Sequence, residues 1–332
     1  MKITVLGTGA WGTALSILAA QNYNQVSLWG RNTDLAAQIA LARENKIHLP
    51  GIALPPSIEV TSDLSTALSG AGIVLVVVPS HGVRDVCKQL AVIPGAKDLR
   101  YISATKGIEG GTGARMTQII AQELGTAQVG VLSGPNLARE IAQGMPAAAV
   151  VAANDAVLST DCQSAFSSDR YRVYTNEDVT GVELGGAFKN VLAIAAGICD
   201  GLGLGNNSKA SLVTRGLFEM TRLAVALGAR PETLSGLSGV GDLMVTCFSD
   251  LSRNRTLGQM LGRGLKLDDI LAAQNSVAEG VKTSRSVAGL SRHAGVETPI
   301  MTGVYALLYE GLSVKEGITQ LMRRDLKPEH KK

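Results

Sequence analysis

The chain has 332 residues, of which 45% are hydrophobic and 18% charged, and its formal net charge is +3. This balance is typical of a folded protein with one large or two smaller domains, and it excludes wholesale disorder. The charge gives no reason to expect a nucleic-acid partner, since the basic C-terminal tail is typical of a solvated terminus. Four scattered cysteines predict reduced thiols, with neither a disulfide framework nor a zinc site. We expect a cytoplasmic protein without stable membrane insertion.

The first predicted element is a strand over residues 2–6, which runs into Gly-Thr-Gly-Ala-Trp-Gly at positions 7–12 and then into a helical stretch. Strand, Gly-x-Gly-x-x-Gly turn and helix in that order form a dinucleotide-binding fingerprint. Gly7 allows the tight turn, Gly9 lets backbone approach a pyrophosphate, and Gly12 lets the helix lie close to the strand. The free N–H groups at the helix N-terminus would face the phosphates.

The second strand, predicted over residues 25–29, ends where such proteins select their cofactor. An acidic residue here would bind the ribose 2′-OH of NAD, whereas an arginine can pair with the 2′-phosphate of NADP. The sequence has Arg31 and no acid before Asp34. NADP(H) is therefore favoured, with NAD(H) as the alternative if Arg31 is an ordinary surface residue.

The rest of the first half alternates strands with helices, which predicts a Rossmann-like, doubly wound α/β domain over residues 1–178. A loop rich in proline is expected over residues 45–57. Further strands are expected over residues 73–78, 99–104, 128–132, 147–152 and 171–174. From residue 179 onward helical spacing replaces the strands, so residues 179–332 are predicted to form an all-α domain. Its expected helices cover residues 179–202, 212–227, 256–261, 279–294 and 300–308. A substrate cleft is expected between the two domains.

Lys189 stands within the first of these helices. Helical spacing gives it small and apolar neighbours on the same face, which removes water from the ammonium group and suits it to proton transfer. The alternative is a structural lysine whose stem packs on the core while its head reaches water. The position alone leaves both interpretations open.

Three other positions combine a functional interpretation with an ordinary one. Lys106 follows a strand at the edge that faces the ligand crevice of a parallel sheet, but it is equally typical of a loop lysine. Asp242 follows two glycines, and it can be interpreted either as a site residue or as an ordinary aspartate in a turn or helix cap. His81, just after the strand at 73–78, is either an acid–base group or a loop residue.

Ser252-Arg-Asn254 precedes a helical stretch, so Ser252 is a natural N-cap with Arg253 in the first turn. Free N–H groups and a guanidinium would together form an anion site. The alternative is a capping motif with a surface arginine. Arginine in a first turn is unfavourable for the helix itself, which favours a ligand.

These stretches together resemble one family, the bacterial NAD(P)-dependent glycerol-3-phosphate dehydrogenases. The matches follow the family order across nearly the whole chain: GTGAWGTA (7–14), VVVPS (76–80), ATKG (104–107), LSGP (132–135), LGGAFKN (184–190), GVGD (239–242), SRN (252–254) and EG (279–280).

The resemblance implies reversible hydride transfer between a nicotinamide cofactor and C2 of sn-glycerol 3-phosphate, which interconverts it with dihydroxyacetone phosphate and feeds glycerophospholipid synthesis. It implies no metal. Lys189 would accept the proton of the C2 hydroxyl, with Lys106 and Asp242 as the other catalytic groups. The implied substrate-binding residues are Lys106, Gly134, Asn136, Lys189, Asn190, Asp242, Thr246, Ser252, Arg253 and Asn254. The implied cofactor-binding residues are Gly7, Gly9, Ala10, Trp11, Gly12, Arg31, Lys106, Ala138, Arg253, Val277 and Glu279.

The chain departs from the family pattern at two of these positions. Many relatives have a hydroxyl residue in place of Ala10, so no side-chain contact to the pyrophosphate is expected there. Asn136 stands where serine or threonine is common, so the backbone is an alternative carrier of its role. Neither departure affects Lys189.

The residues leave other protein classes open. Dehydrogenases of β-hydroxyacids, 6-phosphogluconate and nucleotide-sugars also join a Rossmann domain to helices, although the last would need a catalytic cysteine. A non-enzymatic NADP-binding sensor is a further alternative, but it would not need Lys106, Lys189 and Asp242 together. A homodimer is the expected assembly.

Overall fold

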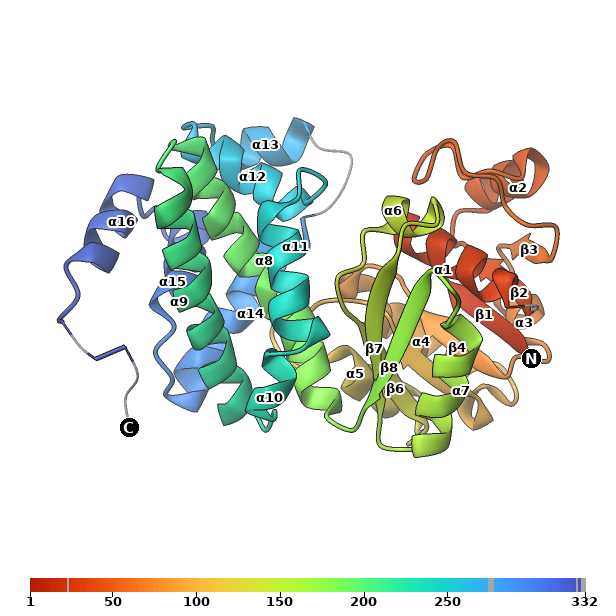
Figure 1. The fold of residues 1–332 in the computed structure, drawn as a ribbon. Helices are drawn as coiled ribbons and strands as arrows, with labels where there is room; N and C mark the ends of the chain where they lie inside the picture. The colour runs from red at the N-terminus through yellow and green to blue at the C-terminus, as the bar shows by residue number, and fades with distance from the viewer. Residues whose placement is uncertain (23, 274–277, 327, 330–332) are drawn as a thin grey trace.

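The predicted strand, glycine turn and helix at the N-terminus form β1 (Lys2–Leu6) and α1 (Ala10–Gln21) in the computed structural model. The structure describes residues 1–22, 24–273, 278–326 and 328–329. Its first half is built on a single sheet and its second half on helices (Figure 1).

The sheet has eight strands in the order β3-β2-β1-β4-β5-β6-β7-β8. All neighbouring pairs are parallel except β6 and β7. The strands after β1 are β2 (Gln25–Trp29), β3 (Ile58–Thr61), β4 (Ile73–Val76), β5 (Arg100–Ser103), β6 (Val129–Ser133), β7 (Ala147–Ala153) and β8 (Tyr171–Asn176). The reversal of order at β1 and β4 creates the crevice in which such sheets bind ligands.

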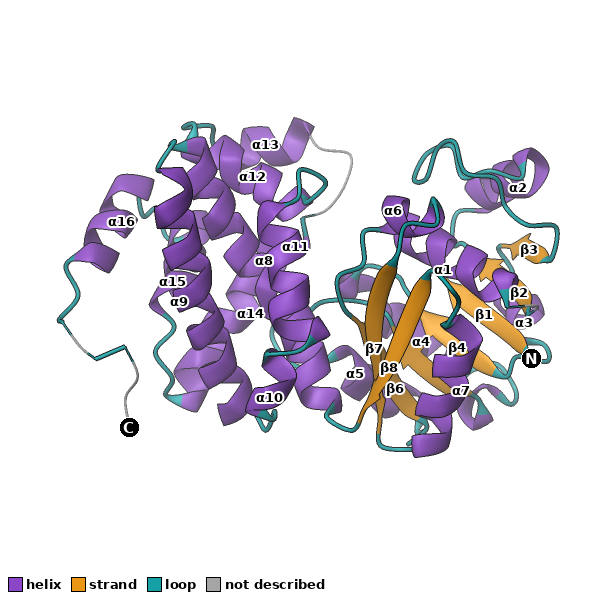
Figure 2. Cartoon of the chain, viewed as in Figure 1, coloured by secondary structure: helices purple, strands orange, loops and turns teal. Residues whose placement is uncertain are grey.

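Helices cover both faces of the sheet, as Figure 2 shows. Side chains alternate across β1, so that Ile3 and Val5 join one apolar cluster while Leu6 joins the other. The first cluster includes α1, α2 (Thr33–Ala42), α6 (Ala138–Ala142) and α7 (Ala156–Phe166). The second includes α3 (Leu64–Leu68), α4 (Val83–Ala91) and α5 (Met116–Leu124). The predicted doubly wound α/β fold is confirmed.

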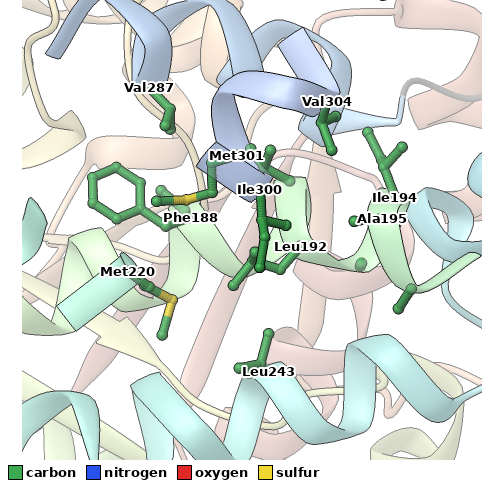
Figure 3. Packing of buried hydrophobic residues seen from close by; sticks show 14 of the residues in the cluster. Phe188, Leu192, Ile194, Ala195, Met220, Leu243, Val287, Ile300, Met301 and Val304 are labelled. Atoms are coloured by element: carbon green, nitrogen blue, oxygen red, sulfur yellow. The ribbon is translucent and has the colours of Figure 1, made fainter. Parts of the chain in front are cut away.

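The second half is organised around α8 (Val179–Gly201), whose Phe188 and Leu192 belong to one apolar cluster with residues of neighbouring helices such as Met301 (Figure 3). By length and composition α8 resembles a membrane span, but its most apolar window is 100% buried inside the protein. The helices that pack against α8 are α9 (Gly205–Ala226), α10 (Pro231–Leu234), α11 (Asp242–Phe248), α12 (Arg253–Gly262), α14 (Glu279–Ala294) and α15 (Pro299–Tyr309). Farther out, α13 (Leu267–Ala273) packs against α12 and α16 (Val314–Met322) packs against α15. The predicted helical character of this half is confirmed.

Two glycines bring α12 against α8 backbone to backbone. A Cβ added at Gly197 would lie 2.0 Å from the carbonyl oxygen of Arg255, and one at Gly258 would lie 2.1 Å from that of Ile194. No side chain fits at either position. The close approach fixes the start of α12 beside the middle of α8, where Lys189 is located.

Some elements differ from the sequence-based expectations. β3 was not predicted because only Ile58 of its four residues is buried, which leaves no apolar run to detect. α9 begins at Gly205, seven residues before the predicted start, because its first turns are exposed and carry no apolar period. A π-helical turn over Leu237–Gly241 leads directly into α11 and was not expected from its glycines alone.

Candidate functional site

The C-terminal ends of the central strands meet the helical half of the chain. β1, β4 and β5 end side by side, with Leu6 next to Val76 and Val76 next to Ser103. Side chains from the helical half reach the segments that follow these strands. The two halves therefore meet at the place where the sequence predicts the substrate cleft, and we refer to this junction as the cleft.

Two lysines share one buried carboxylate in this cleft. Asp242, at the start of α11, is 1% exposed. Its Oδ1 lies 2.9 Å from Nζ of Lys189 in α8, and its Oδ2 lies 2.6 Å from Nζ of Lys106 after β5. Two positive charges against one negative charge leave the cluster with a net charge of about +1, which favours an anionic ligand.

Each ammonium group retains one N–H for a ligand. Lys189 also donates to Thr246 Oγ1 at 2.6 Å, and Thr246 in turn donates to the backbone oxygen of Asp242 at 2.7 Å. Lys106 also donates to the backbone oxygen of Gly134 at 2.8 Å. Because an ammonium has three donors, one remains on each lysine after the bonds that the described residues make. The cluster can therefore donate two hydrogen bonds to one bound molecule.

The surroundings of Lys106 weaken its hold on its proton. Burial lowers the pKa of Lys106 to about 8, and the neighbouring charge of Lys189 acts in the same direction, while Asp242 opposes both. The charge on Lys106 is thus sensitive to pH within the range where enzymes operate. Lys189 is itself 6% exposed, so the structural alternative with a solvated head group does not apply.

A second set of polar side chains joins three helices next to Lys189. Asn254 of α12 donates from Nδ2 to Oδ1 of Asn190 in α8 at 3.0 Å. The same amide accepts from the backbone N–H of Gly280 in α14 at 2.9 Å. Both asparagines are buried, and their amides fix the N-terminal turn of α12 against α8.

The start of α12 has the predicted capping geometry. The hydroxyl of Ser252 accepts from the backbone N–H of Arg255 at 3.3 Å, and Arg253 stands exposed in the first turn. His48, from the loop after α2, lies near enough to Arg253 for the two charges to interact. Burial lowers the pKa of His48, and the charge of Arg253 lowers it further.

The glycine turn has the shape that a dinucleotide requires. A Cβ at Gly12 would lie 1.9 Å from the carbonyl oxygen of Gly7, so only glycine allows α1 to start here. At Gly9 a Cβ would meet nothing within 4 Å, which leaves the backbone open to approach. No side chain caps α1, and the buried Nε1 of Trp11 has no partner among the described residues. These residues fit a bound pyrophosphate.

Four other predicted cofactor residues come from separate parts of the chain. Glu279, at the start of α14, accepts from the hydroxyl of Ser80 at 2.6 Å and so connects the helical half to the end of β4. Arg31 lies just beyond β2, exposed and without a side-chain partner among the described residues. Ala138 begins α6, which packs next to α1. Val277 lies outside the described residues.

Comparisons with known proteins agree over the whole chain. Family models described as the N-terminus and the C-terminus of NAD-dependent glycerol-3-phosphate dehydrogenase match residues 2–159 and 178–319. A glycerol-3-phosphate dehydrogenase [NAD(P)+] of Citrifermentans bemidjiense is 48% identical over 99% of this chain and 98% of its own length. One from Geobacter sulfurreducens is 46% identical over the same shares.

The chain belongs to the NAD-dependent glycerol-3-phosphate dehydrogenase family. A crystal structure of glycerol-3-phosphate dehydrogenase from Coxiella burnetii is 37% identical and superposes with a TM-score of 0.93 over 97% of this chain and 99% of that chain. The resemblance found in the motifs is therefore confirmed, and with it the use of NAD or NADP that the relatives' names state. The family's cofactor fits the glycine turn described above.

The structure brings most of the predicted residues into one cleft. Lys106, Lys189, Asp242, Thr246 and Gly134 are linked directly by hydrogen bonds, and Asn190 and Asn254 lie next to them. Arg31 is remote from this cluster. His81 is exposed in the short turn after β4 and makes no side-chain hydrogen bond among the described residues.

Three residues of the cleft were not singled out by the sequence analysis. Ser80 donates to Glu279, and His48 interacts electrostatically with Arg253. Tyr171, at the start of β8, donates to Asn136 at 2.9 Å. Only Ser80 had a usable signal, because it stands in a motif at the end of a strand. The other two come from a loop and from a strand position that have no local pattern.

The two glycines of the turn give a matched test of cofactor binding. We expect Gly9→Ala to leave thermal stability unchanged, because its methyl group meets no protein atom, and to weaken NAD(P)H binding about tenfold or more by filling the space of the pyrophosphate. Gly12→Ala should destabilise the fold by about 1–3 kcal/mol through overpacking. Thermal unfolding and cofactor titration measure both. A Gly9→Ala protein that binds cofactor like the wild type would contradict this assignment.

Proposed function

We propose that this chain catalyses the reversible reduction of dihydroxyacetone phosphate to sn-glycerol 3-phosphate with NAD(P)H. The observation that supports it most directly is the pair of lysines on one buried carboxylate, at the sheet edge where the glycine turn also lies. A phosphorylated ketone needs positive charge for its phosphate and a proton donor for its oxygen. Bound NAD(P)H supplies the hydride that adds to C2.

Lys189 is the proton donor in this proposal. Its ammonium is held by Asp242 and Thr246, and its remaining N–H is available to the carbonyl oxygen of the substrate. As C2 accepts the hydride pair, the oxygen takes the proton of Lys189 and becomes the hydroxyl of the product. In the oxidative direction the neutral amine of Lys189 takes that proton back. Solvent supplies or removes the proton between turnovers.

The other predicted site residues hold the substrate and the cofactor. We assign Lys106, with Gly134 and Asn136, to the substrate on the sheet side of the cleft. Ser252, Arg253 and Asn254 would bind the phosphate at the start of α12, where backbone N–H groups and a guanidinium meet. Asn190 and Thr246 orient these groups. On the cofactor side we assign the glycine turn with Ala10 and Trp11, together with Arg31, Lys106, Ala138, Arg253, Val277 and Glu279.

Arg31 favours NADP(H) over NAD(H) in this proposal. It stands exposed at the end of β2 without a partner among the described residues, so its guanidinium is available to a 2′-phosphate. The proposed domains are residues 1–178, which bind cofactor, and residues 179–332, which carry Lys189. β8 ends at Asn176 and α8 begins at Val179, which supports this division.

The biological setting that we propose is cytoplasmic supply of sn-glycerol 3-phosphate for glycerophospholipid synthesis, without nucleic acid or stable membrane insertion. The complete burial of the apolar window of α8 supports the last point. We also propose a homodimer, the commonest symmetric assembly. Sedimentation equilibrium should give twice the chain mass of 34.5 kDa, and the single mass would reject the dimer.

Replacing Lys189 tests the reaction. We expect wild-type protein to oxidise NADPH, and more slowly NADH, with dihydroxyacetone phosphate, followed at the reduced nicotinamide absorbance. Lys189→Met should lower kcat by roughly 10²–10⁴-fold, because it removes the group that donates the proton in this proposal, while cofactor still binds. Lys209→Met is the matched control, since Lys209 is also buried and paired with a carboxylate, Asp200, but lies in α9.

The outcomes separate the parts of the proposal. No turnover by wild type with either cofactor, despite cofactor binding, would reject the substrate. An active Lys189→Met enzyme would be consistent with the proposed reaction but would show that Lys189 is not the proton donor. A preference for NADH would show that Arg31 does not bind a 2′-phosphate.

The pH dependence follows from Lys106. Below a pKa of about 8 the ammonium is charged and binds an anionic substrate, and above it the charge is lost. We therefore expect kcat/KM for dihydroxyacetone phosphate to fall as the pH rises through about 8. Lys106→Arg stays charged over this pH range. We expect this variant to be less active at all pH values, but its kcat/KM should no longer fall as the pH rises through about 8. If kcat/KM of the Lys106→Arg variant still falls as the pH rises through about 8, the fall is caused by the titration of another group.

A further inference from the structure

The amide of Asn136 is held in one orientation by a buried phenol. Tyr171 is 1% exposed, and its hydroxyl donates to Oδ1 of Asn136 at 2.9 Å. Burial raises the pKa of Tyr171 far above its usual value, so the phenol keeps the proton that it donates. Because Oδ1 is engaged by Tyr171, Nδ2 of the same amide must point to the other side.

The amide nitrogen of Asn136 is a buried hydrogen-bond donor without an acceptor among the described residues. Nδ2 of Asn136 is shielded from solvent and has no hydrogen-bond partner among the described residues. A buried N–H group that lacks an acceptor is unfavourable, and native structures rarely keep one without a reason. A ligand that brings an oxygen to this point would satisfy it.

The amide lies next to the charged cluster. Asn136 follows Gly134 by two residues, and the backbone oxygen of Gly134 accepts from Lys106. A Cβ added at Gly241, the residue before Asp242, would lie 3.8 Å from Cδ of Pro135, the residue before Asn136. The segment that carries Asn136 therefore lies against the cluster of Lys106, Lys189 and Asp242.

We propose that Tyr171 is a positioning residue that makes the Asn136 amide a one-way hydrogen-bond donor to an oxygen of the bound triose phosphate. The inference rests on the proposed function, because it needs a substrate rich in acceptor oxygens. A serine or threonine at position 136 would offer a hydroxyl that rotates between donating and accepting. The asparagine fixed by Tyr171 can only donate, so it selects an acceptor oxygen at that point of the substrate.

The test is a double-mutant cycle on steady-state kinetics with dihydroxyacetone phosphate, together with calorimetric binding of sn-glycerol 3-phosphate. Tyr171→Phe frees the amide to rotate, so KM and the dissociation constant should rise about three- to tenfold while kcat changes less than about twofold. In an Asn136→Ser background the same Tyr171→Phe change should have an effect under about twofold, because no amide remains to be oriented. Asn136→Asp, which offers only acceptors, should raise KM more than Tyr171→Phe does.

Tyr101→Phe is the matched control. Tyr101 is also fully buried, and its hydroxyl donates to a backbone oxygen, that of Ala96, at 2.7 Å. This change should lower the thermal midpoint to a similar extent as Tyr171→Phe and leave KM at the wild-type value.

Two results would overturn the inference while leaving the proposed function intact. One is an active Tyr171→Phe enzyme with unchanged KM, and the other is an equal effect of Tyr171→Phe with Asn or Ser at position 136. The second result is what a merely structural tyrosine would give. If wild-type protein neither turns over dihydroxyacetone phosphate nor binds sn-glycerol 3-phosphate, the proposed function fails and this inference falls with it.

Discussion

The carboxylate of Asp242 is the interaction on which the site depends. A buried carboxylate is tolerated only when it is paired and hydrogen-bonded, and here each oxygen has a lysine within 3 Å. The two lysines come from different halves of the chain, Lys106 from the end of β5 and Lys189 from α8. One acid therefore fixes two ammonium groups relative to each other and holds the sheet edge to the helical half. Removing that acid would leave two buried positive charges facing each other.

The backbone around Asp242 is built to place this one side chain. A π-helical turn over Leu237–Gly241 delivers it to the start of α11, and Thr246, one turn later, accepts from Lys189. On the facing side, α8 is buried along almost its whole length, so the orientation of Lys189 is determined by packing on every side. Lys189 is thus held in a helix that is packed on every side, as catalysis through preorganised charges requires.

The sequence was most informative about features that depend on local backbone conformation. The glycine turn, the N-cap at Ser252 and the apolar period of α8 follow from local rules, and the structure has all three. The resemblance to a known family named the residues of the charged cluster, but the position of Asp242 between the lysines is a tertiary fact. Its sequence context could not distinguish a plain turn aspartate from a shared counter-ion. The surroundings of Lys189 show the same limit, because its apolar helical neighbours were visible while the carboxylate that holds it was not.

The residues missed by sequence analysis share a physical reason. His48 belongs to a loop and Tyr171 to a strand far along the chain. The role of each depends on a residue distant in sequence, Arg253 for His48 and Asn136 for Tyr171. Tyr171 by itself is an ordinary buried aromatic residue at the start of a strand. With Asn136 it becomes part of a directed hydrogen-bond chain, in which a protonated phenol engages one end of an amide and leaves the other end for a ligand. Fixed polarity of this kind arises only when the phenol and the amide nitrogen are shielded from solvent, since water would otherwise satisfy the amide in either orientation.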